Sequence, residues 1–144
     1  AATSVEEFTQ GSFQPVIGEH AELDANAVDK VLLVSGRLYY DLLANRQKAG
    51  DEKTAIIRVE QLYPLPYKEI QDAVAKYPNA ELVWAQDEPA NQGPWPFIGL
   101  NLPPELDRPL RLVSRPASAS TATGSAKRHA VEQDILVKKA FERR

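Results

Sequence analysis

Four short apolar runs recur along the chain and alternate with segments of helical periodicity. The runs occupy residues 31–34, 54–59, 82–85 and 110–113, and apolar runs of this length are typical of buried strands. They recur in steps of about 25–30 residues, which leaves room for the helix that a right-handed parallel crossover needs. The pattern therefore predicts an α/β fold: a doubly wound, mostly parallel sheet with helices on both faces.

Helical spacing marks the segments between these runs. Residues 38–49 and 67–77 each carry an apolar stripe, and Gly50 and Pro78 end them. A last helix is predicted around the stripe formed by Val131, Ile135, Leu136 and Ala140. Residues 94–102 give a weaker helical signal because prolines surround them, and residues 116–125 form a loop of small residues.

The first 29 residues show no sustained period. Phe8, Phe13, Val16 and Ile17 are scattered among glycine and proline, which predicts an irregular, extended arm that packs a few anchors onto the body. We therefore expect an arm or linker from an upstream domain over residues 1–29 and an α/β domain over residues 30–144. The sequence contains no Met, so we expect it to be a segment of a longer protein.

Composition excludes several classes of function. A chain of 144 residues is long enough for one domain with its own core. Its 17 basic and 20 acidic residues give a net charge of −3, which disfavours nonspecific binding to nucleic acid or to anionic membranes. No segment approaches the roughly 20 apolar residues of a membrane span. There is no Cys and there are two His, so we predict neither a metal site nor catalytic residues in this chain.

The polar segments of the central chain follow the predicted strands. They are residues 35–37, 60–64, 86–93 and 114–116, and in a doubly wound sheet the carboxyl ends of the strands hold ligand and partner sites. Two interpretations stay open: ordinary polar loops, or a surface that docks a neighbouring protein or a small anionic ligand. Ser35-Gly36-Arg37 leads from a strand into a helix, where free backbone N–H groups can hold a phosphate or carboxylate.

The sequence gives little support for a catalytic site. Asp87 and Glu88 are adjacent at a strand end, so their side chains point apart and do not converge on one substrate. His129 and Glu132 are three residues apart near a helix start, which favours pairing across one turn in a capping or interface role. No glycine-rich nucleotide motif is present.

Several segments, in order and spacing, carry a resemblance to a known family. They are Val34–Leu42, Ile57–Pro66, Glu88–Trp95 and Arg115–Ser120, with the opening Phe8–Ile17 and the closing His129–Gln133. Together they resemble the carboxyl-terminal domain of the decarboxylating component of 2-oxoglutarate dehydrogenase, and the closing segment is similar to the actinobacterial branch. Two positions depart from the family: Pro94 stands where Ala is common, and Arg37 stands where Lys is frequent.

The resemblance implies a role within a larger enzyme. The family oxidatively decarboxylates 2-oxoglutarate in the tricarboxylic acid cycle with thiamine diphosphate and magnesium, and transfers the succinyl group to a lipoyl arm. The coenzyme motif, a Gly-Asp-Gly followed much later by Asn, is not in this sequence, so the resemblance places coenzyme and magnesium outside this segment, which is expected to be inactive alone. The implied fold is the transketolase-type third domain, which supports assembly of the homodimer and binds regulators.

Partners and location also follow from the resemblance. The partners are the upstream domains of the same chain, a homodimer partner and the lipoyl acyltransferase component, in the bacterial cytoplasm. The residues expected at the interface edge are Arg37, Glu88, Asn91, Gln92, Trp95, Arg115 and His129. Trp95 is the expected anchor, because a large aromatic residue in a Pro-Gly loop at this edge suits an interface.

An allosteric acyl-CoA effector, such as acetyl-CoA, is a further implication of the resemblance. The matching positions are Thr9, Gln61 and Lys68, beside a helix that opens after Pro66 with unpaired N–H groups. Glu69 brings a negative charge close by. A structural alternative also stays open, in which Lys68 is a solvated helix residue and Thr9 only fixes the arm.

Two other functions remain as alternatives to the assembly and regulatory domain. The first is a stand-alone α/β module that binds a small ligand or a partner. The second is the equivalent domain of a relative that uses pyruvate, a branched-chain acid or a sugar phosphate.

Overall fold

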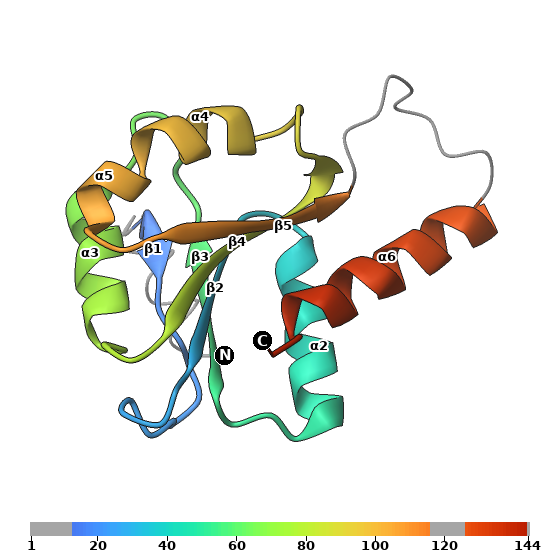
Figure 1. Cartoon of the computed structure of the whole chain (residues 1–144), viewed down its shortest axis with the longest axis horizontal. Coiled ribbons are helices and arrows are strands. Elements are labelled where there is room, and N and C mark those ends of the chain that lie inside the picture. Colours follow the sequence, from blue (N-terminus) through green and yellow to red (C-terminus); the bar gives the residue numbers. More distant parts are fainter. Residues whose placement is uncertain (1–12, 116–125, 144) are drawn as a thin grey trace.

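The computed structural model describes residues 13–115 and 126–143, and it places one five-stranded sheet between two layers of helices (Figure 1). The strand order is β1–β3–β2–β4–β5. The strands are β1 (Val16–Ile17), β2 (Lys30–Val34), β3 (Thr54–Val59), β4 (Glu81–Pro89) and β5 (Leu110–Arg115). Strands β2 to β5 are parallel to their neighbours, and β1 is antiparallel to β3. The predicted α/β fold with a mostly parallel sheet is confirmed.

Helices cover both faces of the sheet. The helices α2 (Leu38–Ala49) and α6 (Ala126–Ala140) lie on one face. The other face carries α3 (Tyr67–Ala75), α4 (Trp95–Asn101) and α5 (Pro103–Leu106). Successive residues of a strand enter opposite cores: Leu33 packs in the α3–α4–α5 core and Leu32 in the α2–α6 core. This is why β2 is buried at all five of its residues and why Val31–Val34 form a continuous apolar run.

The winding of the chain reverses at β2. This strand is in register with both neighbours, since Leu32 lies opposite Ile56 of β3 and Val83 of β4. The first crossover goes to β3 on one side, and the next one passes over β2 to reach β4 on the other. The carboxyl ends of β2 and β4 therefore flank the topological switch point, where open α/β sheets place their crevice.

The described part of the arm is more ordered than the sequence predicts. Val16 of β1 pairs with Val59 at the edge of the sheet, and Val28 is fully buried in the core. Glu19 forms a buried ion pair with Arg46 of α2, and the two side chains are 4% and 7% exposed. A two-residue strand and a pairing between distant polar residues leave no periodic signal, so the sequence pattern did not reveal them.

The remaining elements agree with the sequence in position but differ in extent. β4 continues four residues beyond the predicted run, to Pro89, and the weak helical signal after Pro94 corresponds to α4 followed by the short helix α5. Among the described residues, no helix is long and apolar enough to cross a membrane.

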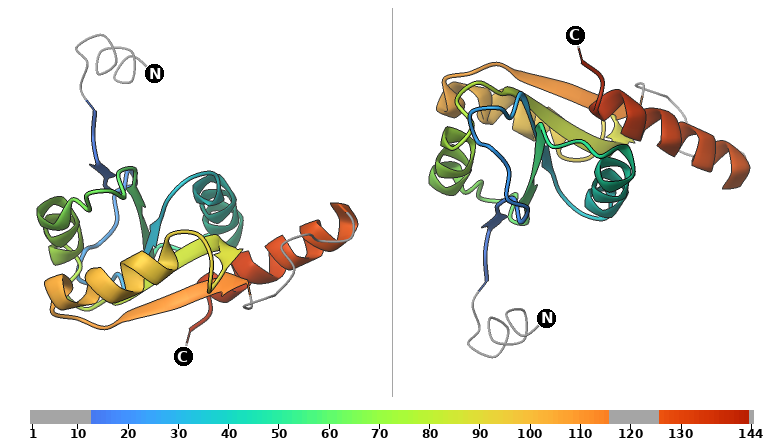
Figure 2. Two further views of the ribbon diagram at one scale, coloured as in Figure 1. Left: turned by 90° about the horizontal axis from the view of Figure 1, so that it is seen from above. Right: turned by 90° about the horizontal axis from the view of Figure 1, so that it is seen from below.

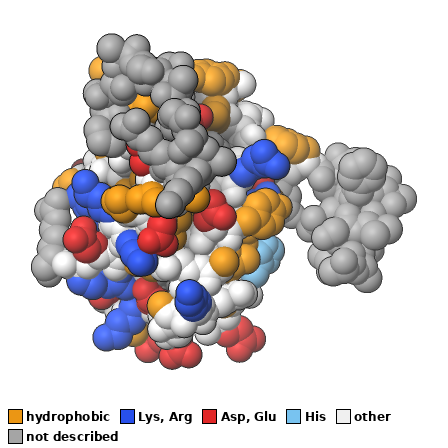
Figure 3. Space-filling view, turned by 90° about the vertical axis from the view of Figure 1, so that its right-hand side faces the viewer, with side chains coloured by type: hydrophobic (Ala, Val, Ile, Leu, Met, Phe, Trp, Pro, Cys, Tyr) orange, Lys and Arg blue, Asp and Glu red, His pale blue; other side chains and the backbone are white. Residues whose placement is uncertain are grey.

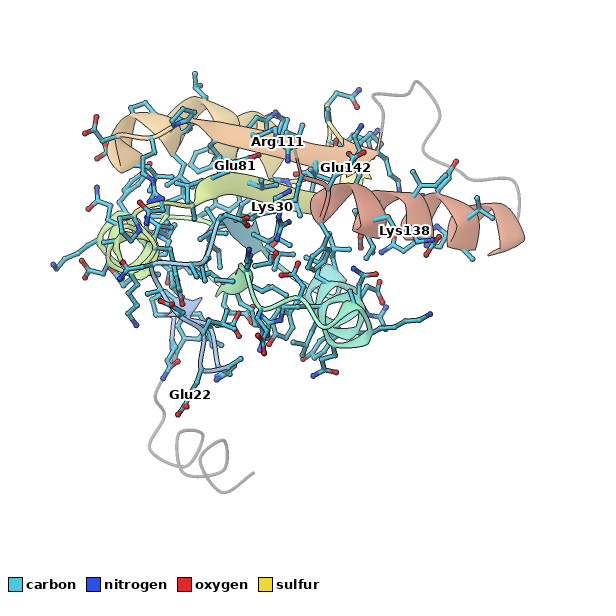
Figure 4. The ribbon with its side chains drawn as sticks, turned by 60° about the horizontal axis from the view of Figure 1, so that its bottom comes forward. Glu22, Lys30, Glu81, Arg111, Lys138 and Glu142 are labelled. Atoms are coloured by element: carbon cyan, nitrogen blue, oxygen red, sulfur yellow. The ribbon has the colours of Figure 1, made fainter. Side chains whose placement is uncertain are left out.

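The C-terminal end of α6 is held at the edge of the sheet where the parallel strands begin. Lys30, which is 1% exposed, donates hydrogen bonds from Nζ to the carbonyl oxygens of Ala140, at 3.0 Å, and Glu142. Figure 4 shows Lys30 of β2 directed toward the end of α6 near Glu142. Arg143 adds ion pairs with Asp29 at 3.1 Å and Asp51 at 3.2 Å. A charged side chain thus ends a helix whose terminal carbonyls favour a cation.

Candidate functional site

A groove of about 770 Å³ lies between α2 and α6 at the carboxyl ends of β2 and β4. Arg37 precedes the first turn of α2, where Gly36 takes a left-handed conformation with φ of 73°. Residues that line the groove include Arg37, Tyr40, Asp41, Asp87, His129 and Gln133. The groove therefore occupies the switch point of the sheet, as expected for a ligand or partner site.

Gln133 of α6 connects three elements at the groove. Its Nε2 donates hydrogen bonds to Oδ2 of Asp41 on α2, at 2.9 Å, and to Oδ1 of Asp87 at the end of β4, at 3.0 Å. Its Oε1 accepts a hydrogen bond from Arg115 at 2.9 Å. One amide thus uses its donors on two carboxylates and its acceptor on a cation, so it fixes how α6 lies against the edge of the sheet.

Arg115, at the end of β5, also contacts two other side chains of α6. Its guanidinium pairs with Glu132 at 2.8 Å and lies 3.3 Å from Nδ1 of His129. The sequence pattern favoured pairing of His129 and Glu132 with each other, whereas the structure directs both toward Arg115. Within the described part of the chain, Nε of Arg115 is buried without a hydrogen-bond acceptor.

An aromatic cluster supports the α2 side of the groove. The Arg58 guanidinium lies 4.5 Å from the ring centroid of Tyr39 and 5.7 Å from that of Tyr40, close enough for cation–π attraction. Arg58 also pairs with Glu60 at 2.6 Å. These contacts hold Tyr40, whose side chain is 59% exposed, at the rim of the groove.

The surface around the projecting end of α6 carries both signs of charge. Figure 3 faces this side and shows Lys, Arg, Asp and Glu side chains interspersed with hydrophobic ones. The groove itself combines Arg37 and Lys48 with Asp41, Asp87 and Asp134. A polyanion prefers a field of one sign, whereas mixed charge with exposed aromatic and aliphatic groups suits a protein surface.

A second set of predicted residues lies in the loop after β4, and a buried glutamine shapes this loop. Gln86 is 3% exposed, and its Nε2 lies 3.2, 3.0 and 2.9 Å from the carbonyl oxygens of Glu88, Pro89 and Gln92. Its Oε1 accepts hydrogen bonds from Nε1 of Trp84 and from the backbone N–H of Trp95. Gln86 is therefore the residue that determines the path of the loop.

The loop residues that the sequence singled out are placed by this network. Glu88 and Asn91 are exposed. The Glu88 side chain lies against Gly93, whose φ of 64° is a left-handed conformation that favours glycine. Trp95 begins α4 and is half-buried against the α3–α4–α5 core.

The predicted effector positions lie elsewhere, around the loop between β3 and α3. Gln61 donates from Nε2 to the carbonyl oxygen of Pro64 at 2.8 Å. Lys68, in the first turn of α3, is 83% exposed and pairs with Asp72 at 3.6 Å. Thr9 lies outside the described residues. The helix does begin directly after Pro66, as predicted.

The structure thus places Arg37 and His129 on the lining of the groove, with the largely buried Arg115 behind His129. It places the residues of the β4 loop around Gln86. Sequence reasoning did not single out Gln133, Asp41 or Gln86. The spacing of four residues between His129 and Gln133 places both on one helix face and is a usable signal. The role of Gln86 leaves no such signal, because its partners are mostly backbone carbonyls.

The described residues do not fit the magnesium ion that accompanies thiamine diphosphate. A hard cation requires several oxygen ligands that converge, and no group of three or more His, Asp or Glu in the described part of the chain could hold a metal ion. In the groove, Gln133 already donates to Asp41 and Asp87. No step of coenzyme chemistry is therefore assigned to these residues.

The sheet order and the helix layers define the class of protein, an α/β domain with a mostly parallel sheet covered on both faces. A solved structure described as "Split gene transketolase, inactive beta4 tetramer" matches 89% of this chain and 43% of its own, with a TM-score of 0.55 and 14% identity. At this identity the likeness concerns the fold alone. Residues 2–141 match the family described as 2-oxoglutarate dehydrogenase C-terminal, and the chain belongs to that family. The resemblance seen in the sequence is confirmed.

Named relatives agree with this assignment. The "2-oxoglutarate dehydrogenase E1/E2 component" of Corynebacterium glutamicum is 49% identical over 99% of this chain. The "2-oxoglutarate dehydrogenase E1 component" of Cupriavidus necator is 42% identical over 98% of it, and the "Multifunctional 2-oxoglutarate metabolism enzyme" of Mycobacterium sp. (strain JLS) is 40% identical over 98%. The chain spans only 12% of the Corynebacterium and Mycobacterium relatives and 15% of the Cupriavidus one.

Proposed function

We propose that this chain is the C-terminal assembly and regulatory domain of a longer enzyme that oxidatively decarboxylates 2-oxoglutarate and succinylates a lipoyl group. The match to the 2-oxoglutarate dehydrogenase C-terminal family over residues 2–141 carries this proposal. In it, thiamine diphosphate and magnesium bind in other parts of the parent chain, which acts as a homodimer in the bacterial cytoplasm and supplies succinyl groups to a lipoyl acyltransferase component. The bacterial relatives with 2-oxoglutarate dehydrogenase names support this extension.

The role of the domain in this proposal is to dock other parts of the assembly at the carboxyl edge of the sheet. The mixed charges and exposed Tyr40 of the α2–α6 groove support a protein partner there. Arg37 and His129 would meet that partner at the groove, with Arg115 holding α6 in place behind them. Glu88, Asn91, Gln92 and Trp95 would meet a partner at the β4 loop.

One experiment tests whether coenzyme binding and catalysis lie outside this chain. The isolated chain should show no saturable binding of magnesium thiamine diphosphate by calorimetry and no consumption of 2-oxoglutarate, while the parent enzyme should show both. Coenzyme binding by the isolated chain would contradict the proposal. A parent enzyme that turns over pyruvate, a branched-chain acid or a sugar phosphate instead would favour the alternative domain assignments.

A regulatory acyl-CoA site at Thr9, Gln61 and Lys68 is a second proposal. The start of α3, where no side chain caps the helix, and the exposed ammonium group of Lys68 support an anionic ligand there. Asp72 competes for that ammonium group. The test is titration of the parent enzyme with acetyl-CoA, in which Lys68→Ala should weaken the response and the control Lys76→Ala, at the other end of the helix, should not. Identical responses of wild type and Lys68→Ala would remove Lys68 from the site.

A further inference from the structure

The outer side of α6 carries apolar side chains that the domain does not bury. The apolar stripe predicted from the sequence divides between two faces of this helix. Leu136 and Ala140 enter the α2–α6 core, whereas Val131 is 54% and Ile135 is 59% exposed. Val131 and Ile135 are four residues apart, so they are neighbours on one face. Figure 2 shows in both views that the amino-terminal half of α6 extends beyond the sheet and α2.

Charged side chains flank this apolar pair in a fixed order. Asp134 precedes Lys138 by one turn on one flank, and their side chains are 63% and 69% exposed. Lys139, also exposed, lies on the other flank. The outer side of α6 is therefore acidic before Ile135 and basic after it. We call Val131, Asp134, Ile135, Lys138 and Lys139 the α6 outer face.

This order of charges is complementary to itself when a second copy of the chain packs antiparallel. Two identical helices that are antiparallel about a twofold axis place each flank against the same flank of the partner, in reverse order. With the axis at Ile135, Asp134 lies near Lys138 of the partner subunit, and the reciprocal contact forms as well. The aliphatic stem of Lys139 then covers Val131 of the partner subunit. The antiparallel pair thus buries the apolar side chains and joins opposite charges.

A parallel pair would bring like charges together instead. Lys138 would lie near Lys139 of the partner subunit. Asp134 would lie near Glu132 of the partner subunit, and like charges across an interface are repulsive. We infer that two copies of this chain pair antiparallel through the α6 outer face, about a twofold axis at Ile135. The inference deepens the proposed function, on whose homodimer it rests, by naming a contact between the two copies.

Charge variants of the 144-residue chain, which carries both of its cores, test the antiparallel contact. Asp134→Lys and Lys138→Asp each place like charges across the axis, so each variant alone should self-associate about tenfold more weakly than wild type. An equimolar mixture of the two should form heterodimers as tightly as wild type, because each variant then meets the opposite charge. Sedimentation equilibrium measures both effects. Rescue on mixing cannot arise within one helix, and a mixture that associates no better than its components would overturn the inference.

A single cysteine tests the position of the axis. The chain contains no Cys, so oxidation of Ile135→Cys with copper phenanthroline should give a disulfide-linked dimer. Leu100→Cys, 76% exposed on α4, is the matched control and should stay monomeric. Two aliphatic side chains from each copy make a small contact, so the wild-type dimer should be weak. A wild-type chain that stays monomeric at roughly 1 mM, or equal crosslinking of the two variants, would overturn the inference. Turnover of 2-oxoglutarate by the parent enzyme tests the proposed function separately, because pairing of the chain does not depend on a substrate.

Discussion

Glu19 shows how one buried carboxylate fastens the arm to the domain. Its Oε2 accepts a hydrogen bond from Arg46 at 2.8 Å, and its Oε1 accepts one from the backbone N–H of Ile56 at 2.7 Å. Burial alone would raise the pKa of Glu19, but the hydrogen bonds from Arg46 and from the N–H groups of Ala21 and Ile56 together hold it below its usual value of 4.5. The carboxylate therefore stays charged inside the protein.

We predict that Glu19→Gln destabilises the chain by about 3 kcal/mol near neutral pH, because buried Arg46 loses its counter-charge. Since the folded-state pKa is lowered, the contribution of Glu19 is complete above pH 4.5 and is lost as the pH falls through the folded value. Urea unfolding between roughly pH 7 and pH 3 should show a smaller loss of stability on acidification in the variant than in wild type.

The control for this prediction is Glu22→Gln in the same arm. Glu22 is exposed and points away from the body (Figure 4), so its substitution should leave both the stability and its pH dependence close to wild type. If Glu19→Gln loses as much stability on acidification as wild type, the charge of Glu19 is not what fastens the arm.

At the scale of elements, α6 is held at both ends by polar contacts rather than by its apolar stripe alone. Arg115 and Gln133 fix its first half at the carboxyl edge of the sheet, while Lys30 and Arg143 fix its end at the opposite edge. Burial is the largest cause of the lowered pKa of Lys30, and the charge of Arg111 adds to it. Desolvation of this lysine is tolerated because its ammonium group meets the carbonyl end of a helix.

We predict that Lys30→Met loosens the last turn of α6, since two terminal carbonyls lose their donor. Amide hydrogen exchange at residues 138–142 should become about tenfold faster, consistent with the 1–3 kcal/mol typical of a lost buried partner. Lys138→Met is the matched control, because the Lys138 side chain is 69% exposed and its ion pair among the described residues runs along the helix, to Asp134 at 3.1 Å. Equal exchange in the two variants would show that the contacts of Lys30 are dispensable.

Elements with a strong periodic pattern could be predicted from the sequence, and polar connections could not. The four parallel strands and the helices α2, α3 and α6 follow from apolar runs and helical stripes. β1 is too short to show a period, and its place is set by Pro15 and Val16 against the edge of β3. Gln86 and Gln133 look like ordinary polar residues in the sequence, because their partners lie far along the chain or are backbone atoms. The location of the site followed from topology, whereas its internal geometry depends on these two amides.

At the scale of the whole molecule, the predicted interface residues lie in two places at the carboxyl edge of the sheet, the α2–α6 groove and the loop after β4. The α2–α6 groove carries mixed charge, and the loop after β4 is shaped by the buried side chain of Gln86. Trp95 follows this loop: its backbone N–H is held by Gln86 at 2.9 Å, and its ring lies so close over Gly99 that an added Cβ there would be 2.8 Å from it. This ring is partly covered within the domain, and its remaining surface is available to a neighbour.

We therefore predict that Trp95→Ala weakens the packing of this domain in the parent enzyme by about 2–4 kcal/mol, as expected for a large aromatic anchor. The isolated chain should lose less, because only part of the ring is buried there. Gly99→Ala should shift the ring without removing it and so cause a smaller loss in the same direction. Melting temperatures of the parent enzyme and of the isolated chain measure both effects. An unchanged melting temperature of the parent would show that Trp95 anchors no interface, and an equal loss in both proteins would confine its role to the core of this domain.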